Sequence, residues 1–133
     1  MFVIESVANP KYICGVFERE KDAKAYLKGL PADLRRHLRV YNVELQFPCF
    51  IIEEDGFEFT GQEDLLARLD QLNASHFDDQ VYFNIYLIDS DFRPKKAGLD
   101  SMGMLRHVHV TSDFLNWYKS EGIGYLNRIG MLD

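Results

Sequence analysis

Short runs of β-forming residues, each ended by a turn signal, recur along this chain and limit the folds open to it. A run of four to eight such residues bounded by Gly, Pro, Asn or Asp is typical of a strand. The pattern predicts strands at residues 2–4, 12–17, 38–45, 47–52, 57–60, 81–88 and 105–110. Ala8-Asn9-Pro10 separates the first two runs and Glu54-Asp55-Gly56 precedes the fifth, so both places predict hairpins.

Helical periodicity interrupts the strands in three places. An amphipathic helix is predicted over residues 18–29, with an apolar stripe formed by Ala23, Tyr26, Leu27 and Leu30. Thr60 and Glu63 match a capping box at the start of a second helix, and a third is expected over residues 113–119. The order of elements predicts a single α+β domain over residues 1–133, with a mostly antiparallel sheet and about three helices packed on it.

The N-terminal residues and the two cysteines indicate the cellular compartment. The first ten residues carry neither the cationic segment nor the apolar segment of a signal peptide, and no run approaches the ~20 apolar residues of a transmembrane helix. Cys14 and Cys49 each lie among apolar neighbours. We expect two reduced, buried thiols in a cytoplasmic protein, with a disulfide as the alternative.

Acidic residues are concentrated in the middle of the chain. The whole chain has 15 Lys and Arg against 21 Asp and Glu, a net charge of −6. Residues 51–92 hold eleven of these acids against Arg68 alone, so this segment carries a net charge of −10. A nucleic-acid binder is disfavoured, because phosphate binding needs cationic surface. A negative face would instead steer a cationic protein partner, although an ordinary solvated surface is the simpler alternative.

The residues that we expect to contact such a partner are acidic and come from the predicted turns, strand ends and loops of this segment. They are Glu53, Glu54, Asp55, Glu58, Asp78, Asp79, Asp89 and Asp91. A nearby aromatic side chain is expected to supply much of the affinity, whereas charges at the rim mainly set the association rate.

Two histidines offer a competing hypothesis. His107 and His109 are two residues apart on a predicted strand, so both side chains face one side and could ligate a single metal ion. A catalytic zinc ion is usually coordinated by three protein ligands, and Asp79 or Asp89 could be the third. Two histidines on a polar strand face are the simpler interpretation. No catalytic motif is present, so we predict no metal, no cofactor and no enzymatic activity.

The N-terminal part resembles a family of small bacterial proteins. The resemblance is carried by the strand Ile13-Cys14-Gly15-Val16-Phe17, a helix with Ala23 and Tyr26-Leu27, and the strand Val40-Tyr41-Asn42-Val43-Glu44. This order is similar to domains associated with immunity to polymorphic toxins, including those of contact-dependent growth inhibition. The resemblance covers about the first 45 residues and implies no particular site residue, because immunity proteins bind through divergent surfaces.

The sequence thus predicts a soluble, cytoplasmic, acidic binding protein that neutralises a cationic toxin domain, with a nuclease as the favoured toxin class, by occluding its active site. Two alternatives stay open. One is a small metal-dependent enzyme centred on His107 and His109, and the other is a dimeric regulatory module that binds a ligand.

Overall fold

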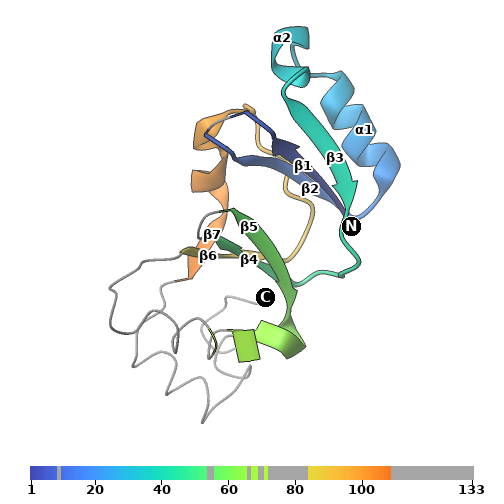
Figure 1. Cartoon of the computed structure of the whole chain (residues 1–133). Helices are drawn as coiled ribbons and strands as arrows, with labels where there is room; N and C mark the ends of the chain where they lie inside the picture. The colour runs from blue at the N-terminus through green and yellow to red at the C-terminus, as the bar shows by residue number, and fades with distance from the viewer. Residues whose placement is uncertain (9, 54–55, 66, 69–70, 72–83, 109–133) are drawn as a thin grey trace. The chain divides into compact units, whose positions relative to one another are not determined.

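The computed structural model describes residues 1–8, 10–53, 56–65, 67–68, 71 and 84–108 (Figure 1). Packing divides the chain into two compact units. Unit 1 comprises Met1–Phe47 and Ser90–Leu105, and unit 2 comprises Pro48–Asp89 and Arg106–Asp133. The predicted α+β class is confirmed, and the strands form two antiparallel sheets, one in each unit, where the sequence predicted one.

The sheet of unit 1 has the order β2-β1-β3. Its strands are β1 (Phe2–Ser6), β2 (Ile13–Phe17) and β3 (Leu38–Asn42). The predicted hairpin is confirmed, because β1 pairs with β2 from Phe2 opposite Phe17 onward. All five residues of β2 are buried. Gly15 is needed there, since a Cβ atom at this position would lie 2.7 Å from Cε2 of Phe17.

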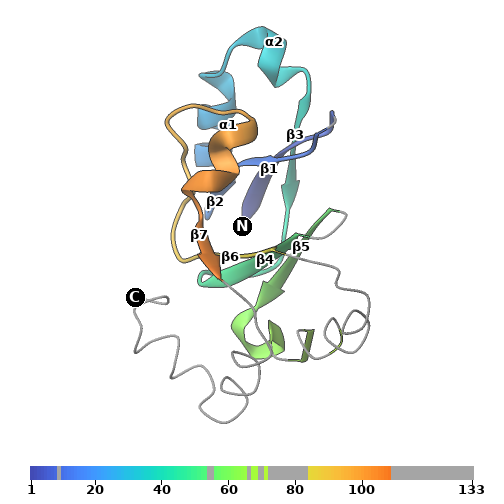
Figure 2. The ribbon, with the colours of Figure 1, turned by 90° about the vertical axis from the view of Figure 1, so that its left-hand side faces the viewer.

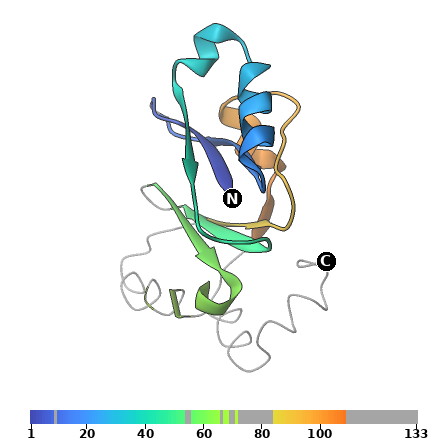
Figure 3. The ribbon, with the colours of Figure 1, turned by 90° about the vertical axis from the view of Figure 1, so that its right-hand side faces the viewer.

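One amphipathic helix packs against this sheet (Figure 3). It is α1 (Glu20–Lys28), which begins two residues after the predicted start and carries acids in its first turn and Lys28 in its last, the favourable order for the helix dipole. Ala23 is fully buried, and the ring centroids of Tyr26 and Phe17 lie 5.5 Å apart. The short helix α2 (Ala32–Arg35), which the periodicity did not predict, joins α1 to β3.

The segment predicted to be a long loop, residues 89–104, contributes ordered structure to unit 1. Phe92 forms a bridge with Val16 through two main-chain hydrogen bonds, of 3.1 and 2.7 Å. A 3₁₀ helix, η1 (Leu99–Met104), lies beside β2 (Figure 2). The buried Ser101 hydroxyl donates to the main-chain oxygen of Ile13 at 2.9 Å, which fastens η1 to that strand.

The sheet of unit 2 has the order β5-β4-β6-β7. Its strands are β4 (Cys49–Glu53), β5 (Phe57–Gly61), β6 (Asn84–Ile88) and β7 (Arg106–Val108). Pro48 directly precedes the central strand β4, a position where its missing N–H is tolerated. Cys49, Phe50, Ile51 and Ile52 are all buried, so β4 is covered on both faces.

The predicted capping box is wrong, because Thr60 continues β5 as the partner of Phe50. Residues 62–65 and 67–68 are helical, so the helix begins one residue later than the box requires. The expected helix at residues 113–119 lies outside the described residues.

Candidate functional site

Charge follows the division into units. Unit 1 holds eleven Lys and Arg against eight Asp and Glu, whereas unit 2 holds four against thirteen. The net charges are therefore +3 and −9, which together give the −6 of the whole chain. The acidic excess expected from the sequence belongs to one compact unit.

Glu53 ends the central strand β4 and accepts hydrogen bonds from two residues of β6. The Nδ2 atom of Asn84 donates to its carboxylate at 3.0 Å, and the Tyr86 hydroxyl donates at 3.3 Å. Asn84 lies directly opposite Glu53 in the register. Burial raises the pKa of Tyr86, and the adjacent Glu53 carboxylate raises that pKa further. Glu53 is thus held in place by two neutral donors.

Glu58 lies on β5 and pairs with Arg68 of the following helical segment. The Nε atom of Arg68 lies 2.6 Å from Oε2 of Glu58, and the two side chains are 35% and 45% exposed. Glu58 is the register partner of Ile52, whereas Glu53 is the partner of Phe57. Because side chains alternate along a strand, Glu53 and Glu58 point to opposite faces of the sheet.

The other two described residues of the predicted set are also engaged. Asp89 follows β6 and pairs with Arg106 of β7 at 3.3 Å. Asp91 belongs to unit 1, where its Oδ1 atom accepts the main-chain N–H of Glu18 at 2.9 Å. The remaining four, Glu54, Asp55, Asp78 and Asp79, lie outside the described residues.

Two further acidic residues of unit 2 follow β5 closely in the sequence. Glu63 and Asp64 occupy the first turn of the helical segment that follows β5, and both are exposed. Their negative charge is favourable at a helix N-terminus. Sequence reasoning counted both in the acidic segment but did not select them. A correctly placed helix start would have identified them, because acidic residues in the first turn of a surface helix are usually exposed.

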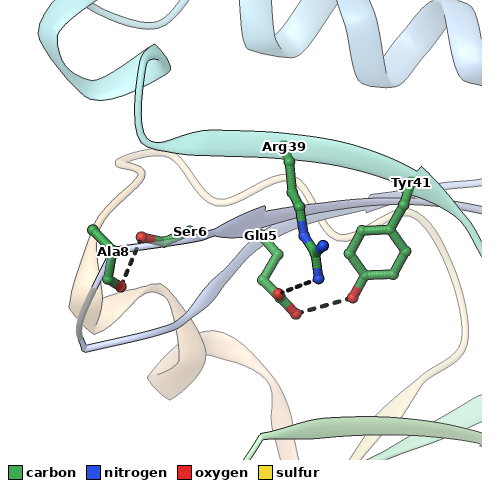
Figure 4. A network of polar contacts seen from close by, with 5 residues as sticks. All are labelled: Glu5, Ser6, Ala8, Arg39 and Tyr41. Atoms are coloured by element: carbon green, nitrogen blue, oxygen red, sulfur yellow. Dashed lines mark hydrogen bonds and ion pairs between the residues drawn. The ribbon is translucent and has the colours of Figure 1, made fainter.

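Unit 1 contains a polar network that the sequence did not indicate (Figure 4). Glu5, only 5% exposed, lies on β1 opposite Arg39 of β3. Its Oε2 atom is 3.1 Å from Nη2 of Arg39, and its Oε1 atom accepts the Tyr41 hydroxyl at 3.0 Å. The Arg39 guanidinium also lies 4.9 Å from the centroid of the Tyr41 ring. The buried carboxylate is therefore both paired with a cation and hydrogen-bonded, as its burial requires.

The histidine hypothesis finds no further support among the described residues. His107 lies on β7 opposite Tyr86, and His109 lies outside the described residues. In the ranges that the structure describes, no three metal-ligating side chains come together.

Cys14 and Cys49 are not joined in a disulfide and both are buried, as predicted. Burial raises the pKa of Cys14 to about 12 and that of Cys49 to about 11. A thiolate is the reactive form of cysteine, so neither residue is suited to nucleophilic chemistry at neutral pH.

Over the same described ranges, no helix is both long and apolar enough to cross a membrane. Comparison with protein-family models, with curated proteins and with solved structures found no match to this chain.

Proposed function

We propose that this chain is an acidic binding protein that neutralises a cationic toxin domain, with a nuclease as the favoured toxin class, by covering its active site. The observation that carries the proposal is the net charge of −9 confined to unit 2. A nuclease presents Lys and Arg to hold substrate phosphates, and an acidic surface is complementary to that site. The resemblance of residues 13–44 to toxin-immunity domains favours this partner class over other cationic proteins.

The proposed docking residues are the acids of unit 2 that were expected from the sequence, except Glu53, together with Glu63 and Asp64. Glu53 is left out because it points to the face of the sheet opposite Glu58. Glu58, Glu63 and Asp64 are exposed and come from β5 and the helical segment directly after it. Asp91 is left out of the proposed surface, because its carboxylate serves unit 1 by holding the N–H of Glu18. Exposed carboxylates of this kind raise the association rate more than they lower the dissociation rate.

The experiment uses the toxin candidate encoded nearest to this chain. The C-terminal domain of the protein encoded directly upstream is co-expressed with this chain, and host growth is measured. We expect growth to be restored when the full chain is present and lost when it is absent. A domain that is not toxic, or that is not neutralised, contradicts the proposed partner class.

The charge argument is tested on the purified pair by stopped-flow association at low and high ionic strength. The double variant Glu63→Gln with Asp64→Asn is expected to associate roughly fivefold more slowly at low salt, with little difference at high salt. The matched control, Asp33→Asn with Glu44→Gln, removes two exposed carboxylates from unit 1 and is expected to associate as the unmodified chain does. An association rate that is flat across ionic strength contradicts an electrostatic mechanism.

A further inference from the structure

We propose that this chain pairs with a second copy of itself through the open edge of β3, so that the unit 1 sheets of the two copies join into one. The two copies of β3 run antiparallel, with Val40 opposite Val40 of the partner subunit. The pairing uses main-chain groups of unit 1, whereas the proposed function uses acidic side chains of unit 2. The two proposals can therefore fail separately.

The two edges of the unit 1 sheet differ in how they are covered. β2 forms one edge, and Val16 on it exchanges two main-chain hydrogen bonds with Phe92. β3 forms the other edge, and in the part of the chain that the structure describes its one strand neighbour is β1. The described strands of unit 2 form a sheet of their own, so none of them pairs with β3.

β3 also lacks the features that usually protect an edge strand. Proteins protect such edges with proline, with a bulge or with charged side chains. β3 contains no proline, and its register with β1 runs from Leu38 to Asn42 without a shift. Its one charged residue is Arg39, and that charge is paired with Glu5. The outer side of β3 is therefore suited to accept another strand.

The hydrogen bonds beside β3 show which of its main-chain groups face outward. Met1 and Val43 donate to each other's main-chain oxygen, at 2.8 Å in each direction, and the N–H of Val7 donates to the oxygen of His37 at 2.8 Å. Hydrogen-bonded and non-bonded pairs alternate along an antiparallel ladder, so every second residue between these two pairs also bonds to β1. The residues of β3 that point their N–H and C=O groups away from β1 are Leu38, Val40 and Asn42.

A second copy of β3 fits these outward groups. Centring the pair on Val40 places Leu38 opposite Asn42 and Arg39 opposite Tyr41, and all five residues of the strand are paired. The outward groups then face one another, and each facing pair exchanges two main-chain hydrogen bonds. Centring the pair on any other residue pairs fewer residues of β3. Centring it on Arg39 also places like charges directly opposite each other, which is unfavourable.

The charges of β3 allow an identical strand to approach. The Arg39 guanidinium lies 3.1 Å from the Glu5 carboxylate and 4.9 Å from the centroid of the Tyr41 ring, and all three side chains share one face of the sheet (Figure 4). In the proposed pairing each Arg39 lies opposite Tyr41 of the partner subunit, and an aromatic ring attracts a guanidinium. Since Glu5 supplies the counter-charge within each copy, the strand that joins the edge needs no acidic residue, and β3 has none.

A disulfide at the two-fold axis tests the register. In the variant Val40→Cys the two introduced thiols lie opposite each other, with Cα atoms about 5.5 Å apart, which a disulfide can span. We expect mild oxidation to yield a reducible covalent dimer. The control Asn42→Cys places a thiol on the same outer side, but opposite Leu38 of the partner subunit, so we expect at least roughly tenfold less covalent dimer. The native thiols of Cys14 and Cys49 are buried and contribute little.

Sedimentation velocity measures the pairing itself. An interface of one strand is small, so we expect a weak dimer at about 10 to 300 μM chain. Val40→Pro removes the central outward N–H but no hydrogen bond to β1, and we expect the dissociation constant to rise at least roughly tenfold. Val40→Ala shortens the side chain but keeps that N–H, and we expect a change below about threefold. Circular dichroism shows whether both variants are folded, and Asn42→Pro makes the same change at an exposed position where Val40→Pro does not fold.

Salt separates this pairing from the proposed toxin binding. The hydrogen bonds between the two strands join uncharged main-chain groups, so we expect the dissociation constant of the dimer to change less than about threefold between about 20 and 500 mM salt. The proposal is overturned if the unmodified chain is monomeric across these concentrations, if Asn42→Cys forms as much covalent dimer as Val40→Cys, or if Val40→Ala weakens the dimer as much as Val40→Pro.

Discussion

The two units are built alike but use charged residues differently. In unit 1 the carboxylates of Glu5 and Asp91 are part of the fold, because one sits buried between two strands and the other holds a main-chain N–H. In unit 2 the carboxylates of Glu53, Glu58 and Asp89 also have partners, but the unit carries nine more negative than positive charges. Such an excess weakens a compact state through self-repulsion. In the described part of unit 2, the contacts of the carboxylates do not account for this excess, and the proposed partner would account for it.

Each unit is built from two separate segments of the chain. The chain passes from one unit to the other at residues 47–48, 89–90 and 105–106. Unit 1 therefore depends on a segment that arrives after three strands of unit 2. That segment is fixed by the Phe92–Val16 bridge and by the Tyr26 hydroxyl, which donates to the main-chain oxygen of Pro94 at 2.7 Å.

The largest expected effect comes from removing the aromatic centre of unit 1. Phe17 is fully buried, contacts Tyr26, and has the Arg93 guanidinium 5.3 Å from its ring centroid. Phe17→Ala leaves a cavity between β2, α1 and the returning segment, and we expect the free energy of unfolding to fall by about 3–5 kcal/mol. Urea denaturation measures the change.

The conservative variant Phe17→Leu serves as the control for that experiment. It restores most of the volume but none of the ring contacts, so we expect it to recover more than half of the lost stability. If Phe17→Ala costs less than about 1 kcal/mol, the returning segment does not pack on β2 as described.

The cysteines provide one chemical probe in each unit. Their burial and raised pKa values, about 12 for Cys14 and about 11 for Cys49, leave little thiolate at pH 8. We expect both to react with a thiol reagent at least roughly a hundredfold more slowly in the native chain than in urea. Variants with Cys14→Ala or Cys49→Ala assign each rate to its unit. A fast native rate at one cysteine would show that its unit opens readily.

The next effect compares a carboxylate in each unit. Glu5→Gln keeps the shape of the side chain but removes the charge that pairs with Arg39, and we expect a loss of roughly 1.5–3 kcal/mol. Glu53→Gln leaves an amide beside neutral donors on a half-buried strand end, and we expect a loss below about 1 kcal/mol. Urea denaturation measures the loss in free energy of unfolding for both variants, and equal losses would contradict the contrast between the units.

Alkaline titration sharpens the same contrast. Burial raises the pKa of Tyr41 above its ordinary value of 10.0, and the Glu5 carboxylate raises it further. A raised pKa in the folded state means that this contribution to stability is complete below about pH 10 and is lost as the pH rises through the folded value. Glu5→Gln should shift Tyr41 ionisation to lower pH, as followed by tyrosinate absorbance. The variant Tyr41→Phe identifies the signal.

Much of the fold could be predicted because it depends on local pattern. The alternation in β3 and the stripe of α1 are properties of neighbouring residues, and both elements lie within the ranges that the pattern predicted. The division into two sheets could not be predicted, because pairing joins residues far apart in sequence. Thr60 shows where prediction from local pattern fails. It fits a capping box, but its pairing with Phe50 places it in a strand.

The candidate site was predictable as charge but not as geometry. Counting acids along the chain located the excess that unit 2 carries. No count could show that Glu53 and Glu58 face opposite sides of one sheet, or that Asp91 lies in the other unit. Glu5 was missed because it lies within an apolar strand, and its partners become visible only when β3 is placed beside β1.

The smallest expected effect on stability comes from an ion pair on β5. The Glu58–Arg68 pair lies at the surface, and exposed ion pairs contribute below about 1 kcal/mol. Glu58→Gln should therefore leave the urea midpoint nearly unchanged, and the double variant with Arg68→Gln should behave likewise. If either variant unfolds much more readily, the acids of unit 2 hold the fold together as Glu5 does in unit 1. If both are stable, slower binding of a cationic partner by Glu58→Gln reports on docking alone, because the fold has not changed.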